Sequence, residues 1–154
     1  MILLCGLNSE SYSDVDITFV NTEEEVKNAI FERFEGEDAK YKFEDKRCTI
    51  DVFDDEERWN EWHTWHVYQW FEVTGEYIIV HHHAFDGVDF DIAGEYPTWS
   101  KAMDNLIMKA FDHYADCPED QREFQWLNHN SACIDTGNEW EHWLIVETPV
   151  EVKQ

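Results

Sequence analysis

The sequence predicts an α+β protein: a single domain, residues 1–154, whose mostly antiparallel sheet has two main amphipathic helices packed on one face. Three observations lead to this prediction. Short apolar segments with period-two alternation recur along the chain, as in the strands of a half-buried sheet. Two other segments repeat their apolar residues every three or four positions, as amphipathic helices do. The composition, 43% hydrophobic and 16% aromatic, supplies one sizeable core, and no low-complexity linker interrupts it.

The first quarter of the chain predicts two strands and a helix. Residues 1–7 form an apolar run typical of a buried strand, and residues 15–20 alternate between apolar and polar side chains. Thr22 followed by Glu25 fits a capping box, in which each side chain accepts a hydrogen bond from the other residue's backbone. The helix is expected to begin there and to end near Gly36.

The next segments predict further strands. Residues 41–43 and 48–53 are expected to pair as a hairpin, and residues 65–73 are rich in the aromatic and β-branched side chains typical of strands. Between them, three residues have a spacing that would place them on one helical face: Trp59, Trp62 and His66. Residues 74–76 predict a turn that joins 65–73 to a strand at 77–85, forming a long hairpin.

The second half begins with a turn signal at Asp86-Gly87, followed by alternation over 88–92, which predicts a third adjacent antiparallel strand. The clearest helix spans 98–115. Its apolar residues share one face: Trp99, Met103, Leu106, Ile107, Ala110 and Tyr114. Residues 123–127 fit either a strand or a short helix, and 132–135 with 140–147 predict a final hairpin. The sheet is expected to contain six to eight strands, and no repeat of solenoid period is evident.

The most informative property for function is charge. The chain has 35 Asp and Glu against 11 Lys and Arg, a formal net charge of −24. Such an excess repels itself in a compact fold, which suggests that binding to a basic partner maintains it. The predicted partner is a basic nucleic-acid-binding protein or nuclease. Direct binding to nucleic acid or to a membrane is not expected, because both are themselves negative.

The candidate contact surface is the stretch between Arg58 and Lys101, which contains no Lys or Arg, together with the acidic run just before it. Asp89 and Asp91 are two apart on a predicted strand, so they face the same way about 6.6 Å apart and can imitate a row of phosphates. The candidate phosphate substitutes are Asp54, Asp55, Glu56, Glu57, Glu72, Glu76, Asp86, Asp89, Asp91 and Glu95. Trp59 and Trp62 are the candidate aromatic anchors of the interface.

In size, acidity and predicted α+β pattern the chain resembles two classes of inhibitor. One is the DNA mimic that phages and mobile elements direct against restriction or CRISPR proteins. The other is the immunity protein that neutralises a nuclease toxin. Both resemblances imply a binding protein without catalytic residues or a cofactor. A solvated acidic surface with no partner is the plain alternative, although an aromatic-rich chain is less typical of a salt-adapted protein.

A second alternative is a metal-binding protein or metal-dependent enzyme. His81 and His83 share one face of a predicted strand while His82 points the other way, and Asp86 could complete a two-histidine, one-carboxylate site. The spacing from Gly75 to these histidines resembles the start of a cupin metal motif, but the glutamate that completes that motif is absent. At low pH, neutral histidines would gain charge and weaken the acidic field.

Other sequence features point away from catalysis. There is no glycine-rich phosphate loop, no H-E-x-x-H and no G-x-S-x-G. Four separated cysteines form no C-x-x-C pair: Cys5, Cys48, Cys117 and Cys133. No secretory signal and no apolar run of about 20 residues is visible. These features predict a cytoplasmic protein with reduced thiols. A homodimer is an open alternative, since strand edges and surplus tryptophans could support one.

Overall fold

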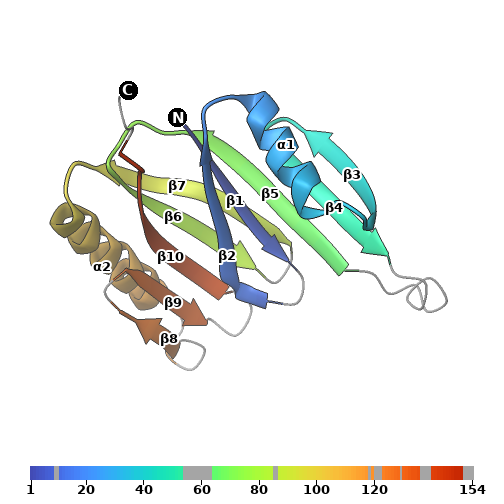
Figure 1. Ribbon diagram of the computed structural model, residues 1–154. Helices are drawn as coiled ribbons and strands as arrows, with labels where there is room; N and C mark the ends of the chain where they lie inside the picture. The colour runs from blue at the N-terminus through green and yellow to red at the C-terminus, as the bar shows by residue number, and fades with distance from the viewer. Residues whose placement is uncertain are drawn as a thin grey trace. The chain divides into compact units, whose positions relative to one another are not determined.

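The computed structural model describes residues 1–8, 11–53, 64–84, 87–117, 119, 123–128, 130–135 and 140–150. Within these residues the chain forms ten strands and two helices (Figure 1). All strand pairs are antiparallel, and the strands divide into two five-stranded sheets. The predicted α+β class, the antiparallel pairing and the two helices are confirmed, but one sheet of six to eight strands is replaced by two sheets.

The chain divides into two compact units, which we call the N-unit (Met1–Glu72) and the C-unit (Val73–Gln154). The single domain predicted from composition stays a prediction. The elements of the N-unit are β1 (Ile2–Asn8), β2 (Ser11–Val20), α1 (Glu23–Arg33), β3 (Asp38–Glu44), β4 (Arg47–Phe53) and β5 (Thr64–Glu72). Its sheet, sheet A, has the strand order β2-β1-β5-β4-β3. The last strand of the unit therefore lies in the middle of the sheet, beside the first.

The C-unit contains the second sheet and the longer helix. Its elements are β6 (Tyr77–Ala84), β7 (Val88–Tyr96), α2 (Trp99–Asp116), β8 (Glu123–Leu127), β9 (Ser131–Asp135) and β10 (Trp140–Glu147). Its sheet, sheet B, has the strand order β7-β6-β10-β9-β8. The segment that fits either a strand or a short helix in sequence is thus strand β8, which pairs with β9 at the edge of the sheet.

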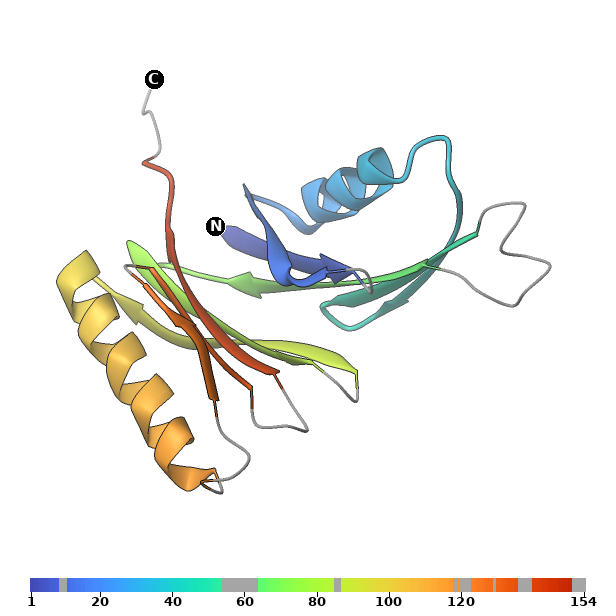
Figure 2. The same cartoon turned by 90° about the horizontal axis from the view of Figure 1, so that it is seen from below.

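The two units follow one plan. Each has two strands, a helix and three strands in chain order, and in each the fifth strand pairs with the first and the fourth. Figure 2 shows each helix lying along one face of its own sheet. Both helices begin after a threonine whose hydroxyl accepts a backbone hydrogen bond, Thr22 in α1 and Thr98 in α2. The repeated plan lets the same position be compared in the two units.

Two local predictions are wrong. The hairpin across residues 74–76 does not form: β5 pairs with β1 and β4 in sheet A, whereas β6 pairs with β7 and β10 in sheet B. A turn signal shows where a strand ends but does not select its partner. His66 does not lie on a helical face either, because it belongs to β5, and the other two residues of that predicted face lie outside the described residues.

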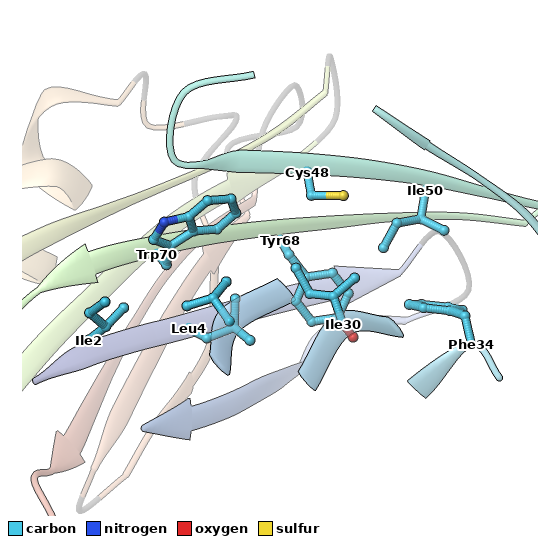
Figure 3. Packing of buried hydrophobic residues seen from close by; sticks show 9 residues of the cluster. Ile2, Leu4, Ile30, Phe34, Cys48, Ile50, Tyr68 and Trp70 are labelled. Carbon is cyan, nitrogen blue, oxygen red and sulfur yellow. The ribbon is translucent and has the colours of Figure 1, made fainter. Parts of the chain in front are cut away.

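The core of the N-unit lies between α1 and sheet A (Figure 3). Helix α1 begins with the predicted capping box between Thr22 and Glu25 and buries the apolar side of its amphipathic stripe. The buried members of this core are Ile2, Leu4, Val26, Ile30, Phe34, Cys48, Ile50, Tyr68 and Trp70. Because helix and strands each contribute one apolar face, the unit has a core of its own.

The core of the C-unit lies between α2 and sheet B. Its buried members are Ile79, Ala102, Leu106, Ala110, Ala132, Ile134, Trp143 and Ile145. The prediction of an apolar face on this helix is confirmed for Leu106 and Ala110, but Trp99 at the helix start is 42% exposed. Sheet B also buries side chains on the face away from α2, among them His82 and His142.

Candidate functional site

The predicted acidic surface is only partly visible in the structure. Of the candidate residues, seven lie outside the described residues: Asp54, Asp55, Glu56, Glu57, Trp59, Trp62 and Asp86. The other five are exposed: Glu72, Glu76, Asp89, Asp91 and Glu95. Four of these five belong to the C-unit, and three of them lie on strand β7.

Strand β7 is an edge strand of sheet B whose side chains alternate between two environments. Val88 and Phe90 are buried, whereas Asp89 and Asp91 are exposed. This is the carboxylate pair that the sequence predicts. The two aspartates lie opposite His83 and His81 of the neighbouring strand β6.

Glu95 has a structural contact that the sequence did not indicate. Its carboxylate accepts hydrogen bonds from the backbone N–H groups of Thr74 and Gly75, at 2.7 and 2.8 Å. It therefore ties the start of the C-unit to β7. Of the three predicted carboxylates on β7, Glu95 has its charge partly compensated by backbone donors.

His81 is held between two carboxylates. Its Nδ1 atom is 3.0 Å from Asp91 Oδ1, and its Nε2 atom makes a short hydrogen bond with Glu141 Oε2. The three residues come from neighbouring strands β7, β6 and β10. The predicted common face of His81 and His83 is confirmed, with their ring centroids 6.3 Å apart, while His82 is buried on the other face.

Glu141 is the buried member of this group. Its side chain is 7% exposed, and the side chain of Asp91 is 67% exposed. Helix α2 contributes His113, whose Nε2 atom lies 3.9 Å from Glu141 Oε1 and makes no hydrogen bond with any described residue. We call the group of His81, His83, His113, Asp91 and Glu141 the histidine–carboxylate cluster.

The pKa values in the cluster follow from its contacts. Burial disfavours the charged form of His81, but the hydrogen bond and negative charge of Glu141, with those of Asp91, outweigh it and raise the pKa of His81. Burial likewise opposes ionisation of Glu141, yet its hydrogen bond to His81 and the neighbouring histidines lower the pKa of Glu141. Both shifts favour an ion pair.

Trp143 on β10 connects the cluster to the apolar core. Its ring stacks on the imidazole of His81, with centroids 5.0 Å apart and planes inclined by 16°. The His113 ring meets the same indole edge-on at 5.6 Å. One buried indole therefore fixes the orientation of imidazoles from both β6 and α2.

The histidines of the opposite face behave differently. His142 lies opposite His82 in the pairing of β10 with β6, and their rings meet at 4.7 Å. Burial, with the charges of His82 and His81 adding to it, lowers the pKa of His142 to about 3. Sheet B thus favours a charged histidine on one face and a neutral histidine on the other.

The N-unit has a counterpart of the cluster. Gly6 lies opposite Asp16 on one side and Tyr68 on the other, just as His81 lies between Asp91 and Trp143. Here the cation is Arg33 of α1, whose Nε atom is 2.6 Å from Asp16 Oδ2. A Cβ atom on Gly6 would overlap the Tyr68 ring, so glycine makes room for the aromatic side chain.

The geometry bears on the metal alternative. Both ring nitrogens of His81 face carboxylate oxygens, which leaves no lone pair directed at a metal ion. Within the described part of the chain, no three His, Cys, Asp or Glu side chains are arranged to hold a metal ion. Asp86, the third ligand of the predicted site, lies outside that part.

Sequence reasoning missed Glu141 and His113. Glu141 is 60 residues from the histidine that it contacts, so no local pattern connects them. A signal was present nonetheless: Glu141 is an acid in a strand made mostly of apolar and aromatic residues, and such an acid needs a partner when the strand is buried.

The cysteine side chains are the remaining candidates for a reactive group. All four cysteines are thiols; Cys5, Cys48 and Cys133 are buried and Cys117 is half-buried. Burial raises the pKa of Cys48 to about 11, which disfavours the reactive thiolate.

Neither α1 nor α2 has the length and apolar character that crossing a membrane requires. Comparisons with family models, with curated proteins and with solved structures give no match.

Proposed function

We propose that the protein acts by binding, as an acidic inhibitor that occupies the groove of a basic nucleic-acid-binding protein or nuclease. The observation that supports this most strongly is the surface charge of the C-unit. Among the side chains described there, nine carboxylates are exposed: Glu76, Asp89, Asp91, Glu95, Asp104, Asp112, Asp116, Glu119 and Glu147. The described Lys and Arg side chains of this unit are only Lys101 and Lys109.

The mechanism is electrostatic imitation of a nucleic acid backbone. Asp89 and Asp91 project from the same face of an edge strand, about 6.6 Å apart at ordinary strand geometry. A groove lined with Lys and Arg would exchange its counterions for these carboxylates, as it does for phosphates. Long-range attraction of this kind mainly increases the association rate, and it weakens with salt.

Apolar side chains on α2 supply the second component. Trp99, Met108 and Phe111 are exposed on this helix, and Asp104 and Asp112 lie among them. Exposed aromatic and methionine side chains inside a charged rim are typical of interface hot spots. In this proposal they lengthen the lifetime of the complex and serve as anchors alongside the predicted Trp59 and Trp62.

Two partner classes satisfy the same chemistry. A restriction or CRISPR protein offers a groove for duplex nucleic acid, and a nuclease toxin offers an active site lined with basic residues. The DNA-mimic inhibitor is the first proposal and the immunity protein is its alternative. Both place the protein in the cytoplasm, where reduced cysteines are expected.

The test is a pull-down from the lysate of the host cell with three baits: the wild type, Asp89→Lys/Asp91→Lys, and Glu35→Lys/Glu37→Lys. We call Asp89→Lys/Asp91→Lys the β7 variant and Glu35→Lys/Glu37→Lys the N-unit variant. The N-unit variant is the control, because it makes the same change in charge on exposed acids of the N-unit. Bound proteins are washed at about 50 mM and about 500 mM salt, challenged with DNA, and identified by mass spectrometry.

We expect the wild type and the N-unit variant to retain one basic nucleic-acid enzyme at low salt, to lose it at high salt, and to release it to DNA. The β7 variant should not retain it. Capture of no basic protein by the wild type would contradict the proposal. Stoichiometric metal in protein purified without a tag would then favour the metal-binding alternative.

A further inference from the structure

The contacts of His81 impose a requirement on its protonation. Asp91 and Glu141 present acceptor oxygens to the two ring nitrogens at once. A neutral imidazole carries one N–H and can donate to only one of them, whereas an imidazolium donates to both. The geometry around His81 is therefore that of a charged histidine bridging two ionised carboxylates.

Loss of that proton affects the two carboxylates unequally. Glu141 is buried and has little access to bulk water, so it retains the one remaining N–H. The unprotonated Nδ1 atom would then present a lone pair to Asp91. Because the Asp91 side chain is 67% exposed, it can turn away into solvent at little cost.

Among the described residues, the titratable groups around His81 come from four elements: β6, β7, β10 and α2. Strand β6 contributes His81 and His83, and α2 contributes His113 at 3.9 Å from Glu141. The carboxylates come from β7 and β10: Asp89 opposite His83, Asp91 opposite His81, and Glu141. With neutral histidines these six groups carry a formal charge of −3, and with all three histidines protonated they carry none.

We propose that the histidine–carboxylate cluster is a proton-operated switch for the exposed carboxylates of β7. Protonated His81 ties Asp91 to β6 and neutralises it, whereas neutral His81 releases Asp91 to solvent as a bare carboxylate. The raised pKa of His81 agrees with this assignment, because it places the change above the ordinary value of 6.5. The consequence for binding rests on the proposed function: a basic partner should bind more tightly as the pH rises.

The switch itself is tested by nitrogen-15 NMR of the imidazoles as a function of pH, in the full chain. In the wild type, both His81 nitrogens should carry protons at pH 6.5, with a titration midpoint above that value. Asp91→Asn should move the midpoint downward, because it removes one carboxylate contact. Asp89→Asn, a neighbouring change on the same strand, should move it much less.

A His81 midpoint at or below 6.5 in the wild type, or one that Asp91→Asn leaves unchanged, would overturn the switch. His81→Gln is a second variant, since it is neutral at every pH. If it folds, its β7 amide spectrum at low pH should match that of the wild type at high pH, and a persistent difference would count against the switch.

The consequence for binding is tested with a hexalysine peptide, which stays cationic between about pH 6 and about pH 8.5. The wild type should bind it about twofold to fivefold more tightly at the higher pH, as one carboxylate becomes available. His81→Gln should reduce this difference clearly, and the control His66→Gln in the N-unit should leave it nearly unchanged.

The proposed function and the regulatory role of the switch can be contradicted separately. If the wild type does not bind hexalysine at either pH, the electrostatic basis of the proposed function is contradicted, whatever the NMR titration shows. If the peptide binds equally at both pH values while His81 titrates as expected, the regulatory role of the switch is overturned and the proposed function is untouched.

Discussion

The N-unit and the C-unit place the same arrangement at the same position but use different cations. In each unit, one residue of the first strand pairs with an aspartate on the second strand and with an aromatic residue on the fifth strand. In the N-unit Arg33 pairs with Asp16 and also lies 5.4 Å above the Tyr68 ring. In the C-unit His81 pairs with Asp91 and stacks on Trp143.

The difference matters because an arginine keeps its charge at any pH at which the protein is folded, whereas a histidine does not. The N-unit carries 19 Asp and Glu against 7 Lys and Arg, and the C-unit carries 16 against 4, so each has a formal net charge of −12. Equal net charge thus conceals two kinds of neutralisation, one permanent and one dependent on protons. Five predictions test this comparison.

The largest effect is expected where the cluster joins the core. Trp143 is 4% exposed, packs in the core of the C-unit and orients two imidazoles. Trp143→Ala should lower the free energy of unfolding by about 3–5 kcal/mol. Trp99→Ala is the control, because its indole is 42% exposed and should cost less than about 1 kcal/mol. Denaturant titrations would measure both, and equal costs would contradict the placement of Trp143.

The next effect is the acid sensitivity of the C-unit. Folding lowers the pKa of His142 from 6.5 to about 3, so below 6.5 protons bind the unfolded chain in preference. The stability from this histidine is complete above 6.5 and is lost as the pH falls, by up to about 1.4 kcal/mol per pH unit. His142→Leu should remove this slope in denaturation measured across pH. A slope that persists unchanged would assign the acid sensitivity to other groups.

On the opposite face of sheet B, the histidine–carboxylate cluster makes two contributions to the stability of the C-unit, and these change with pH in opposite directions. His81 has a raised pKa, so its contribution is complete below 6.5 and is lost as the pH rises through the raised value. Glu141 has a lowered pKa, so its contribution is present above 4.5 and is lost as the pH falls through the lowered value. Because the contribution of His142 falls below pH 6.5 and that of His81 falls above it, denaturation measured across pH should find the C-unit most stable near pH 6.5.

The matching pair in the N-unit should be smaller in effect and insensitive to pH. Arg33→Met removes an ion pair with Asp16 and a hydrogen bond to Thr18, and should cost about 1–2 kcal/mol because the pair is half-buried. The cost should be the same at neutral and mildly alkaline pH. Lys42→Met is the control, since its pair with Glu44 is exposed and should cost less than about 0.5 kcal/mol. An Arg33→Met cost that varies with pH in this range would break the comparison.

The smallest effect tests the shared plan of the two units. The hydroxyls of Thr22 and Thr98 accept hydrogen bonds from Glu25 N and Lys101 N, at 3.1 and 3.2 Å. Thr22→Ala and Thr98→Ala should each cost about 1 kcal/mol, as the loss of a helix N-cap usually does. Hydrogen exchange read at the first turns of α1 and α2 would measure the two costs separately. A cost at only one of them would show that the two helix starts are not equivalent.

Local patterns predicted the elements well, and three of the four predicted hairpins form: β3 with β4, β6 with β7, and β9 with β10. The predicted hairpin of β5 with β6 does not form. The capping box at Thr22, the helix after Thr98 and the alternation of Asp89 and Asp91 each depend on neighbours within a few residues, and all three are confirmed. Strand partners depend on distant segments, so the sequence did not indicate that β5 and β6 belong to different sheets.

The site divides in the same way. The turn signal at Asp86-Gly87 placed His81 and Asp91 on adjacent strands, but the other two partners in the cluster, Glu141 and His113, come from β10 and α2. Nothing local shows that a carboxylate 60 residues away will be buried against an imidazole. The apolar setting of Glu141 is the one sequence property that marks it as a residue requiring a partner.

The most direct test of the central claim is the affinity of the captured basic protein for the wild type, for Asp89→Lys/Asp91→Lys and for Glu35→Lys/Glu37→Lys, each measured at two salt concentrations. The account predicts a loss of about tenfold or more for the β7 variant with a shallower salt dependence, and a loss of less than about threefold for the N-unit variant. Equal losses would show that net charge alone governs binding, and would contradict a contact surface on the C-unit.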